Sequence, residues 1–201
     1  MSSLRLRGLT RCMVPAILIF LLQAGPAAGG GRSEPDTTVL VLAAASLTDV
    51  LPRVASLWKE AGGPGVRFSF DATSRLAPQV LQGAPADLFF SADEGWMDWV
   101  AEGGGIREET RTRVIANELV LVVPGESGYS PPGPAALVES DLSRLALAGE
   151  NVPAGRYGKS ALESFGAWEG LEGRVVRAGT VRGVLEWVAR GEVDAGIVYR
   201  T

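Results

Sequence analysis

Hydroxyl side chains stand where predicted strands give way to predicted helices. Ser46 follows the apolar run 39–42, and Thr73 follows the alternating run 66–70. The first turn of a helix has unpaired N–H groups and lies at the positive end of the helix dipole, so it attracts anions. Two interpretations stay open on this pattern alone: helix capping, which is favoured for Ser46, and an anion-binding site.

The capping interpretation names specific side chains. Ser46 or Thr48 would cap the helix predicted to start near residue 50, with Asp49 in its first turn. Thr73 and Ser74 are the cap candidates for the next helix. Each cap would place a hydroxyl at the end of a strand, which is also where ligands bind in open α/β sheets.

Several kinds of chemistry are excluded. The 201 residues contain no histidine, which removes Ser-His-Asp and Cys-His catalysis and His-ligated metals. Ser56–Lys59 matches S-x-x-K without its companion motifs, and 158–160 ends like a phosphate loop without the required glycine. The net charge of −4 argues against nucleic acid as a partner. The carboxylates show no telling spacing and are interpreted as solvated helix faces.

Apolar periodicity predicts an α/β chain. Strands are predicted at 39–42, 66–70, 88–91, 118–123, 145–148, 175–176 and 194–199. Helical spacing is found at 50–58, 76–81, 96–100, 161–165 and 185–188. The alternation of strands and helices up to residue 105 favours a parallel sheet with helices on its faces. One stripe of an amphipathic helix is formed by Val50, Leu51, Val54, Leu57 and Trp58. The strand at 88–91 is expected to be buried.

The N-terminus has the features of a secretory signal peptide. Three arginines precede the apolar core Met13–Leu22, and small residues suited to cleavage follow at 24–30. The only cysteine, Cys12, lies before this core, so it cannot carry a lipid anchor at the cleavage point. The mature protein is therefore expected to be exported and free of disulfides.

From about Thr38 to its end, the chain resembles the periplasmic molybdate-binding proteins of bacterial ABC transporters. The likeness rests on AAASLTDV (43–50), GAPADLFFSAD (83–93) and VPAGRYGK (152–159), and it continues through Val181-Arg-Gly and Gly196–Tyr199. The resemblance implies a type II periplasmic-binding-protein architecture. Two α/β lobes with parallel-rich sheets, covered by helices on both faces, are joined by crossing strands, and the ligand lies between them.

The domain organisation follows from the same comparison. Residues 1–30 are expected to be signal peptide and leader, 37–116 the first lobe and 117–201 the second. Members of the family run on for several dozen residues beyond the Gly-Ile-Val-Tyr strand. Both lobes are therefore expected to lack a C-terminal part, and residues 31–201 made alone are expected to aggregate and to bind molybdate poorly.

The resemblance places the oxyanion contacts on Ser46, Thr73, Ala154, Val181 and Tyr199. The first two would give hydroxyl and backbone N–H donors, the next two backbone N–H donors, and the last its phenolic hydroxyl. Molybdenum would be held as molybdate through these residues, with no direct metal ligand and no cofactor. The family usually has serine where this chain has Thr73, so the donor is kept while the methyl group narrows the pocket.

Three charged residues stand close to these positions. Asp71 would repel a dianion unless it is turned away from it. Arg156 and Arg182 are interpreted as surface charges, and a field that favours the anion is the alternative.

The implied function is an extracytoplasmic, non-enzymatic binding protein. It would capture molybdate, and tungstate as well, in the periplasm as a monomer and deliver it to an inner-membrane ABC permease. One alternative is a receptor for another small oxyanion such as sulfate or phosphate. An enzyme is the least favoured reading, because the chain has no cofactor motif and no activated nucleophile.

Overall fold

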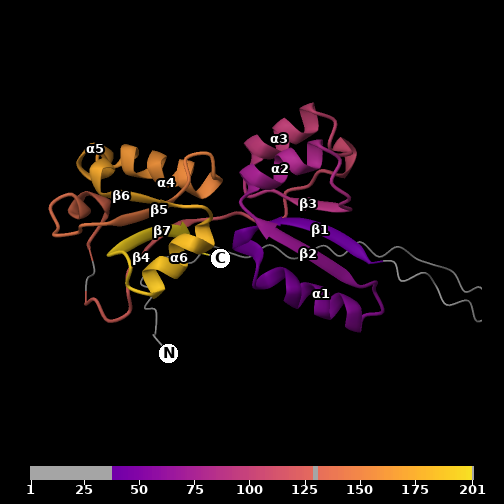
Figure 1. Ribbon diagram of the computed structural model, residues 1–201, viewed down its shortest axis with the longest axis horizontal. Coiled ribbons are helices and arrows are strands. Elements are labelled where there is room, and N and C mark those ends of the chain that lie inside the picture. Colours follow the sequence, from indigo (N-terminus) through magenta and orange to yellow (C-terminus); the bar gives the residue numbers. More distant parts are fainter. Residues whose placement is uncertain (1–37, 129–130, 201) are drawn as a thin grey trace, which may run out of the picture.

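The molecule consists of two α/β lobes, each built around its own sheet (Figure 1). The computed structural model describes residues 38–128 and 131–200, so the predicted signal peptide at 1–30 and Cys12 lie outside the described residues. In the described ranges, no helix is long and apolar enough to cross a membrane.

The first lobe contains a parallel three-stranded sheet in the order β2-β1-β3. Its elements are β1 (Val39–Ala44), the 3-10 turn η1 (Ala45–Leu47), α1 (Val50–Glu60), β2 (Val66–Asp71), α2 (Thr73–Leu81), β3 (Leu88–Phe90), α3 (Glu94–Glu102) and the 3-10 turn η2 (Glu108–Thr110). Helices α2 and α3 cover one face of the sheet, and α1 lies along the other (Figure 1). The parallel sheet predicted from the strand–helix alternation is confirmed.

Burial in this lobe is one-sided. Leu76 and Ala77 of α2 and Val100 of α3 are fully buried on one face of the sheet. The helix predicted around residue 50 forms as α1, yet none of its described residues is buried. The prediction of a buried strand at 88–91 was wrong, because β3 is a sheet edge, none of its three residues is buried, and Leu88 is 50% exposed.

The second lobe contains a four-stranded sheet in the order β4-β7-β5-β6. Its elements are β4 (Leu119–Val122), the 3-10 turn η3 (Pro134–Leu137), β5 (Leu145–Ala148), α4 (Pro153–Ser164), α5 (Trp168–Leu171), the 3-10 turn η4 (Glu172–Arg174), β6 (Val175–Ala178), α6 (Val181–Ala189) and β7 (Ala195–Tyr199). Strand β5 pairs in parallel with β6 and β7, and β4 is antiparallel to β7. Helices α4 and α5 cover one face and α6 covers the other (Figure 1).

Two apolar clusters hold the second lobe together, one on each face of its sheet. Leu147 of β5 packs in the cluster that includes Leu162 of α4, and Ala146 packs in the cluster that includes Val184 and Val188 of α6. Every residue of β5 and β7 is buried. Strands covered on both faces have continuous apolar sequences, which is why these two were recognisable as strands.

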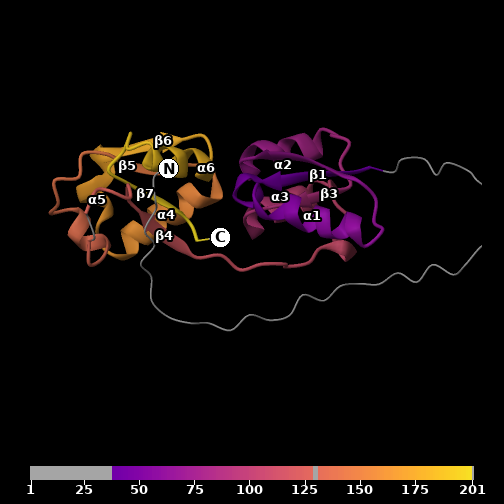
Figure 2. The same cartoon turned by 90° about the horizontal axis from the view of Figure 1, so that it is seen from below.

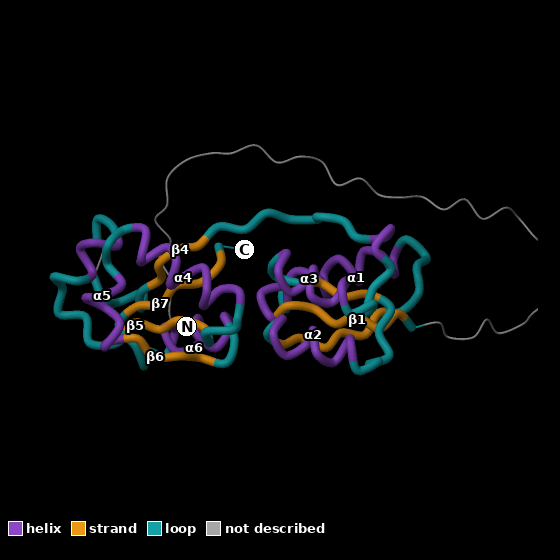
Figure 3. The backbone as a smooth tube through the Cα atoms, turned by 90° about the horizontal axis from the view of Figure 1, so that it is seen from above, coloured by secondary structure: helices purple, strands orange, loops and turns teal. Residues whose placement is uncertain are grey.

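Residues 111–118 run from the first lobe to β4 as an extended segment without helix or strand (Figures 2 and 3). The boundary expected between residues 116 and 117 falls inside this linking segment. The α/β class, with parallel-rich sheets and helices on both faces, is confirmed.

Candidate functional site

The helix starts of both lobes face one another across a small interlobe pocket. Turn η1 follows β1, α2 follows β2, α4 follows β5 and α6 follows β6, so each begins beyond the carboxyl end of a strand. This is the edge at which open α/β sheets bind ligands. The pocket has a volume of about 10 Å³ and is lined by Ala44, Ala45, Ser46, Ala72, Thr73, Ala92, Val152, Pro153, Ala154, Val181 and Tyr199.

All five residues predicted as oxyanion contacts lie in this lining. Ser46 and Thr73 come from the first lobe, and Ala154, Val181 and Tyr199 come from the second. Ser46 and Tyr199, which are 153 positions apart in the chain, therefore line the same pocket.

The two hydroxyls of the first lobe are held differently. Ser46 lies in the middle of η1, and the described part of the chain gives its hydroxyl no hydrogen-bond partner. Thr73 is the first residue of α2 and is 1% exposed. Its Oγ1 accepts a 3.0 Å hydrogen bond from the Ala92 N–H, so its own hydrogen remains available to donate.

The second lobe presents backbone N–H groups from two helix starts. Ala154 lies in the first turn of α4, and Val181 is the first residue of α6, so neither N–H has a partner within its helix. Thr180 caps α6 by accepting a 3.0 Å hydrogen bond from the Gly183 N–H. The first turn of α4 lies against the end of β5. A Cβ on Gly155 would come within 2.4 Å of the Ala148 carbonyl oxygen, so glycine permits this approach.

Tyr199 provides the clearest sign of a ligand. Its side chain is buried, and within the described residues its Oη has no hydrogen-bond partner. A buried hydroxyl without a partner is costly, and such groups in folded proteins usually mark a function or a bound molecule. Burial raises the pKa of the Tyr199 phenol well above its ordinary value, so the hydroxyl keeps its proton and acts as a donor.

The pocket itself carries no charged side chain among the described residues that line it. Asp71 does not line the pocket. Its Oδ1 accepts hydrogen bonds from Arg75 Nε at 2.8 Å and from the Ala72 N–H at 2.7 Å. The repulsion expected from this carboxylate is therefore offset by its own neighbour on α2.

Arg156 and Arg182 are 47% and 29% exposed, as the surface-charge interpretation expected, but each is also paired with a carboxylate. Arg156 of α4 forms an ion pair with Asp93, and Arg182 of α6 forms one with Asp49. Both carboxylates belong to the first lobe, so the two arginines connect the lobes directly beside the pocket.

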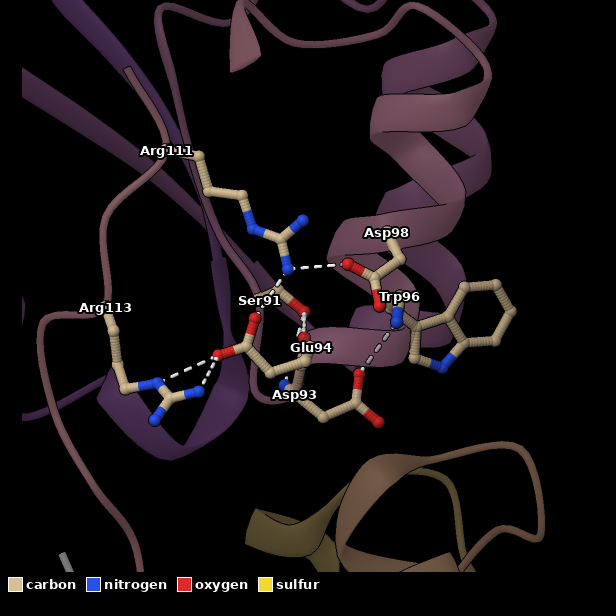
Figure 4. Close-up of polar contacts among 7 residues, drawn as sticks. All are labelled: Ser91, Asp93, Glu94, Trp96, Asp98, Arg111 and Arg113. Atoms are coloured by element: carbon tan, nitrogen blue, oxygen red, sulfur yellow. Dashed lines mark hydrogen bonds and ion pairs between the residues drawn. The ribbon is translucent and has the colours of Figure 1, made fainter. Parts of the chain in front are cut away.

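Asp93 also organises the start of α3 (Figure 4). Its Oδ1 accepts a 3.0 Å hydrogen bond from the Trp96 N–H and caps the helix. The Glu94 carboxylate accepts hydrogen bonds from Arg111 Nη2 at 2.5 Å and from Arg113 Nε at 2.9 Å. These two arginines hold the pKa of Glu94 below its ordinary value. The linking segment is thus tied to the same helix that Asp93 caps.

The capping predictions were wrong at both junctions. Helix α1 has Asp49 at its N-cap position without a side-chain capping bond, and Thr48 Oγ1 donates instead to the Ala45 carbonyl at 2.7 Å. The N-cap of α2 is Ala72, so Thr73 lies one position too far into the helix to cap it. Neither Ser46 nor Thr73 is used as a cap, and both residues line the pocket.

Sequence reasoning missed Asp93 as an important side chain. The carboxylates were interpreted as solvated, whereas the Asp93 side chain is 1% exposed. One available signal was its position directly before a helix, since Asp is a preferred N-cap residue. Its partner on the other lobe left no signal in the sequence.

The chemistry of this site is hydrogen-bond donation by neutral groups. The five predicted residues that line the pocket carry seven potential donors: the backbone N–H groups of Ser46, Thr73, Ala154 and Val181, and the hydroxyls of Ser46, Thr73 and Tyr199. Across the ranges that the structure describes, no group of three or more Asp, Glu, His or Cys residues is placed to hold a metal ion. Donors gathered at helix starts are suited to an anion.

Comparison with known proteins agrees with this geometry. The chain is 39% identical over 180 residues to the molybdate-binding protein ModA of Escherichia coli (strain K12), a match that covers 86% of this chain and 69% of that protein. It is 41% identical over 170 residues to ModA of Haemophilus influenzae, covering 81% of this chain and 66% of that protein.

A solved structure shows the same fold. The periplasmic molybdate-binding protein of Azotobacter vinelandii superimposes with a TM-score of 0.71 at 24% sequence identity, over 80% of this chain and 71% of that one. Residues 39–201 match the family model described as "Bacterial extracellular solute-binding protein". With this match over most of its length, the chain belongs to the bacterial extracellular solute-binding protein family.

Proposed function

We propose that this chain captures molybdate, and also tungstate, between its lobes and delivers the anion to an ABC permease of the inner membrane. The observation that carries the proposal is the buried Tyr199 hydroxyl, which has no hydrogen-bond partner among the described residues and lies in a pocket lined by four other residues that can donate. The E. coli and H. influenzae relatives, both named as molybdate-binding proteins, support this choice of anion.

The ligand contacts in this proposal are Ser46, Thr73, Ala154, Val181 and Tyr199. Their seven donors match the lone pairs of a tetrahedral dianion, and helix starts with partial charges of about +0.5 replace a formal cation. A site made of donors favours an oxyanion that carries no proton. Hydrogen phosphate has an O–H that would need an acceptor here, so it is expected to bind worse.

Size provides the second criterion. Sulfate is smaller than molybdate, and donors fixed on two lobes cannot all close on it. The five contact positions lie on two separate lobes, so an anion enters the pocket when the lobes part. Two sheets joined by the linking segment 111–118 allow such a movement.

The proposed function also requires that the protein is exported and that the chain forms two lobes. Residues 1–30 act as a cleaved signal peptide and leader, which places the protein in the periplasm. Residues 37–116 and 117–201 form the two lobes between which the anion is held. The assignment as a binding protein, not an enzyme, follows the nature of the family.

Titration calorimetry with molybdate, tungstate, sulfate and phosphate tests the proposal. Molybdate and tungstate are expected to bind with closely similar affinity, because both are tetrahedral dianions of nearly the same size. Sulfate is expected to bind far more weakly, and phosphate more weakly still. Sulfate or phosphate binding at least as tightly as molybdate would identify a receptor for a different oxyanion and overturn the proposal.

A further inference from the structure

We propose that Arg156 and Arg182 are positioning residues that, paired with Asp93 and Asp49, form a clasp holding the two lobes closed around the anion pocket. The name clasp is used below for these two ion pairs. None of its four residues lines the pocket. The proposal rests on the proposed function for its ligand, although closure of the lobes can be measured without any anion.

The first half of the clasp fixes the start of α4. Arg156 lies two residues beyond Ala154, and its guanidinium pairs with Asp93 Oδ2. The Asp93 side chain is 1% exposed, and its other oxygen caps α3. A hydrogen bond between the same two regions lies beside this pair, from Trp96 Nε1 to the Asn151 carbonyl at 3.1 Å. The helix start that carries one donor is therefore tied to the opposite lobe.

The second half fixes the start of α6 in the same way. Arg182 directly follows Val181, and it pairs with Asp49, three residues after Ser46. Arg75 Nη2 also donates across the cleft to the Gly179 carbonyl at 3.2 Å, just before α6 begins. Each donor-bearing helix start of the second lobe thus has an arginine paired with a carboxylate of the first.

Charge explains why ion pairs suit this position. A buried carboxylate beside a site for a dianion would repel the ligand, and an isolated buried charge is strongly disfavoured. Arg156 neutralises Asp93 without entering the pocket. The site keeps neutral donors only, while the charged contacts act between the lobes.

Exposed ion pairs in general contribute little, so the arrangement matters more than the number of pairs. The pair Arg190–Glu186 illustrates the ordinary case: its charged atoms are 3.9 Å apart, both side chains are 64% exposed, and it joins neighbouring turns of the same lobe. The Asp93 pair differs because its carboxylate is buried. Both clasp pairs also join lobes that must separate to release a ligand.

The expected effect is on the closed population. A ligand held by both lobes binds a closed form, and its apparent affinity falls in proportion to the fraction of molecules in that form. Contacts made only when the lobes are closed also slow dissociation more than they speed association. Removing a clasp pair should therefore open the cleft and accelerate release.

Closure is measured first, without anion. In the full chain carrying Cys12→Ser, spin labels at Glu102→Cys and Glu169→Cys report the distance between the lobes. Arg156→Gln and Arg182→Gln are each expected to broaden and lengthen this distribution, whereas the control Glu186→Gln leaves it unchanged. Distributions that stay identical in both arginine variants would overturn the proposal.

Release is measured second, with molybdate as the probe in stopped-flow dissociation. Arg156→Gln is expected to release molybdate about tenfold to a hundredfold faster, because its partner Asp93 is buried. Arg182→Gln is expected to accelerate release less, because the Asp49 side chain is 70% exposed. The exchanged pair Asp49→Arg with Arg182→Asp is expected to recover most of that smaller loss. Release rates equal to that of Glu186→Gln would contradict the clasp. If Asp93 or Arg156 variants do not fold, the Asp49–Arg182 side decides alone. If the unaltered chain binds no molybdate, the proposed function fails while the distance measurement still judges the clasp.

Discussion

At the residue scale, Tyr199 offers the most direct test of the site, because its buried hydroxyl has no partner among the described residues. Removing a hydroxyl that serves only a ligand has opposite effects on binding and on folding. The ligand loses a charge-assisted hydrogen bond, while the anion-free protein is relieved of a buried unsatisfied group.

We expect Tyr199→Phe to weaken molybdate binding by about 1.5–3 kcal/mol, or roughly tenfold to a hundredfold, without lowering the melting temperature of the anion-free protein. Calorimetry and thermal unfolding measure the two quantities. Tyr157→Phe is the matched control, since Tyr157 is 43% exposed and does not line this pocket. A less stable variant with unchanged affinity would assign Tyr199 to the core alone.

The same hydroxyl predicts the dependence on alkaline pH. The pKa of Tyr199 is raised in the folded protein by burial, so the folded chain keeps this proton when the unfolded chain begins to lose it near pH 10. The contribution of this proton to the free energy of unfolding is fully present below pH 10. It is lost as the pH rises toward the pKa of Tyr199 in the folded protein. Molybdate affinity is expected to be constant from pH 6 to 9. Above pH 10, the free energy of unfolding of the unaltered protein is expected to fall more steeply than that of Tyr199→Phe. Parallel stability curves for the two proteins would disprove this.

The residues of the site show what a sequence can and cannot reveal. Ser46, Thr73, Ala154, Val181 and Tyr199 were identified through resemblance, and the structure brings them together at one pocket. Their proposed role as ligands stays a prediction. The hydroxyls were misassigned as possible caps because capping depends on which residue directly precedes the helix. Helix α1 starts at Val50 after Asp49, and α2 starts at Thr73 itself, after Ala72.

At the element scale, the start of α4 depends on Gly155. The added methyl group of alanine would lie 2.4 Å from the Ala148 carbonyl oxygen and 2.2 Å from that of Gly149. Backbone atoms cannot move away as a flexible side chain would, so the first turn of α4 must shift outward.

Gly155→Ala is therefore expected to lower the melting temperature by several degrees and to weaken molybdate binding, because Ala154 moves with the turn. Gly173→Ala is the matched control, since nothing lies within 4 Å of its added Cβ. Calorimetry and thermal unfolding of both variants check the prediction. An affinity equal to that of the control would show that this turn does not position a donor.

The elements also differ in how well their sequences predicted them. Strands β5 and β7 were predicted because burial on both faces leaves continuous apolar runs. Helix α1 was predicted from its apolar stripe, but its exposure was not, since periodicity shows which side is apolar and not whether anything covers it.

At the scale of the whole molecule, the lobes meet through contacts that local patterns cannot predict. Arg156 and Asp93 are 63 residues apart, and Arg182 and Asp49 are 133 residues apart. Periodicity and turn chemistry describe short windows of sequence, whereas these pairs depend on how two sheets are placed relative to one another. The expectation of two lobes came from resemblance, and the ion pairs between them came from the structure.

The apolar face of α1 is the other feature of the molecule as a whole. Val50, Val54, Leu57 and Trp58 form one stripe of the helix and are 44–65% exposed. Contiguous apolar surface of this kind is uncommon on isolated monomers and drives association. It argues against the expected monomer for the 201-residue chain at high concentration.

We expect the chain to self-associate through this stripe, and Leu57→Lys to shift the association to at least about tenfold higher protein concentration, because burying one leucine contributes roughly 1.5–3 kcal/mol. The free energy of unfolding should change little, since Leu57 is 65% exposed. Ser56→Lys, one position away on the same helix, adds the same charge outside the stripe and serves as the control. Sedimentation velocity over a concentration series distinguishes the outcomes. A chain that stays monomeric throughout, or equal association of the two lysine variants, would show that α1 does not mediate contact between copies.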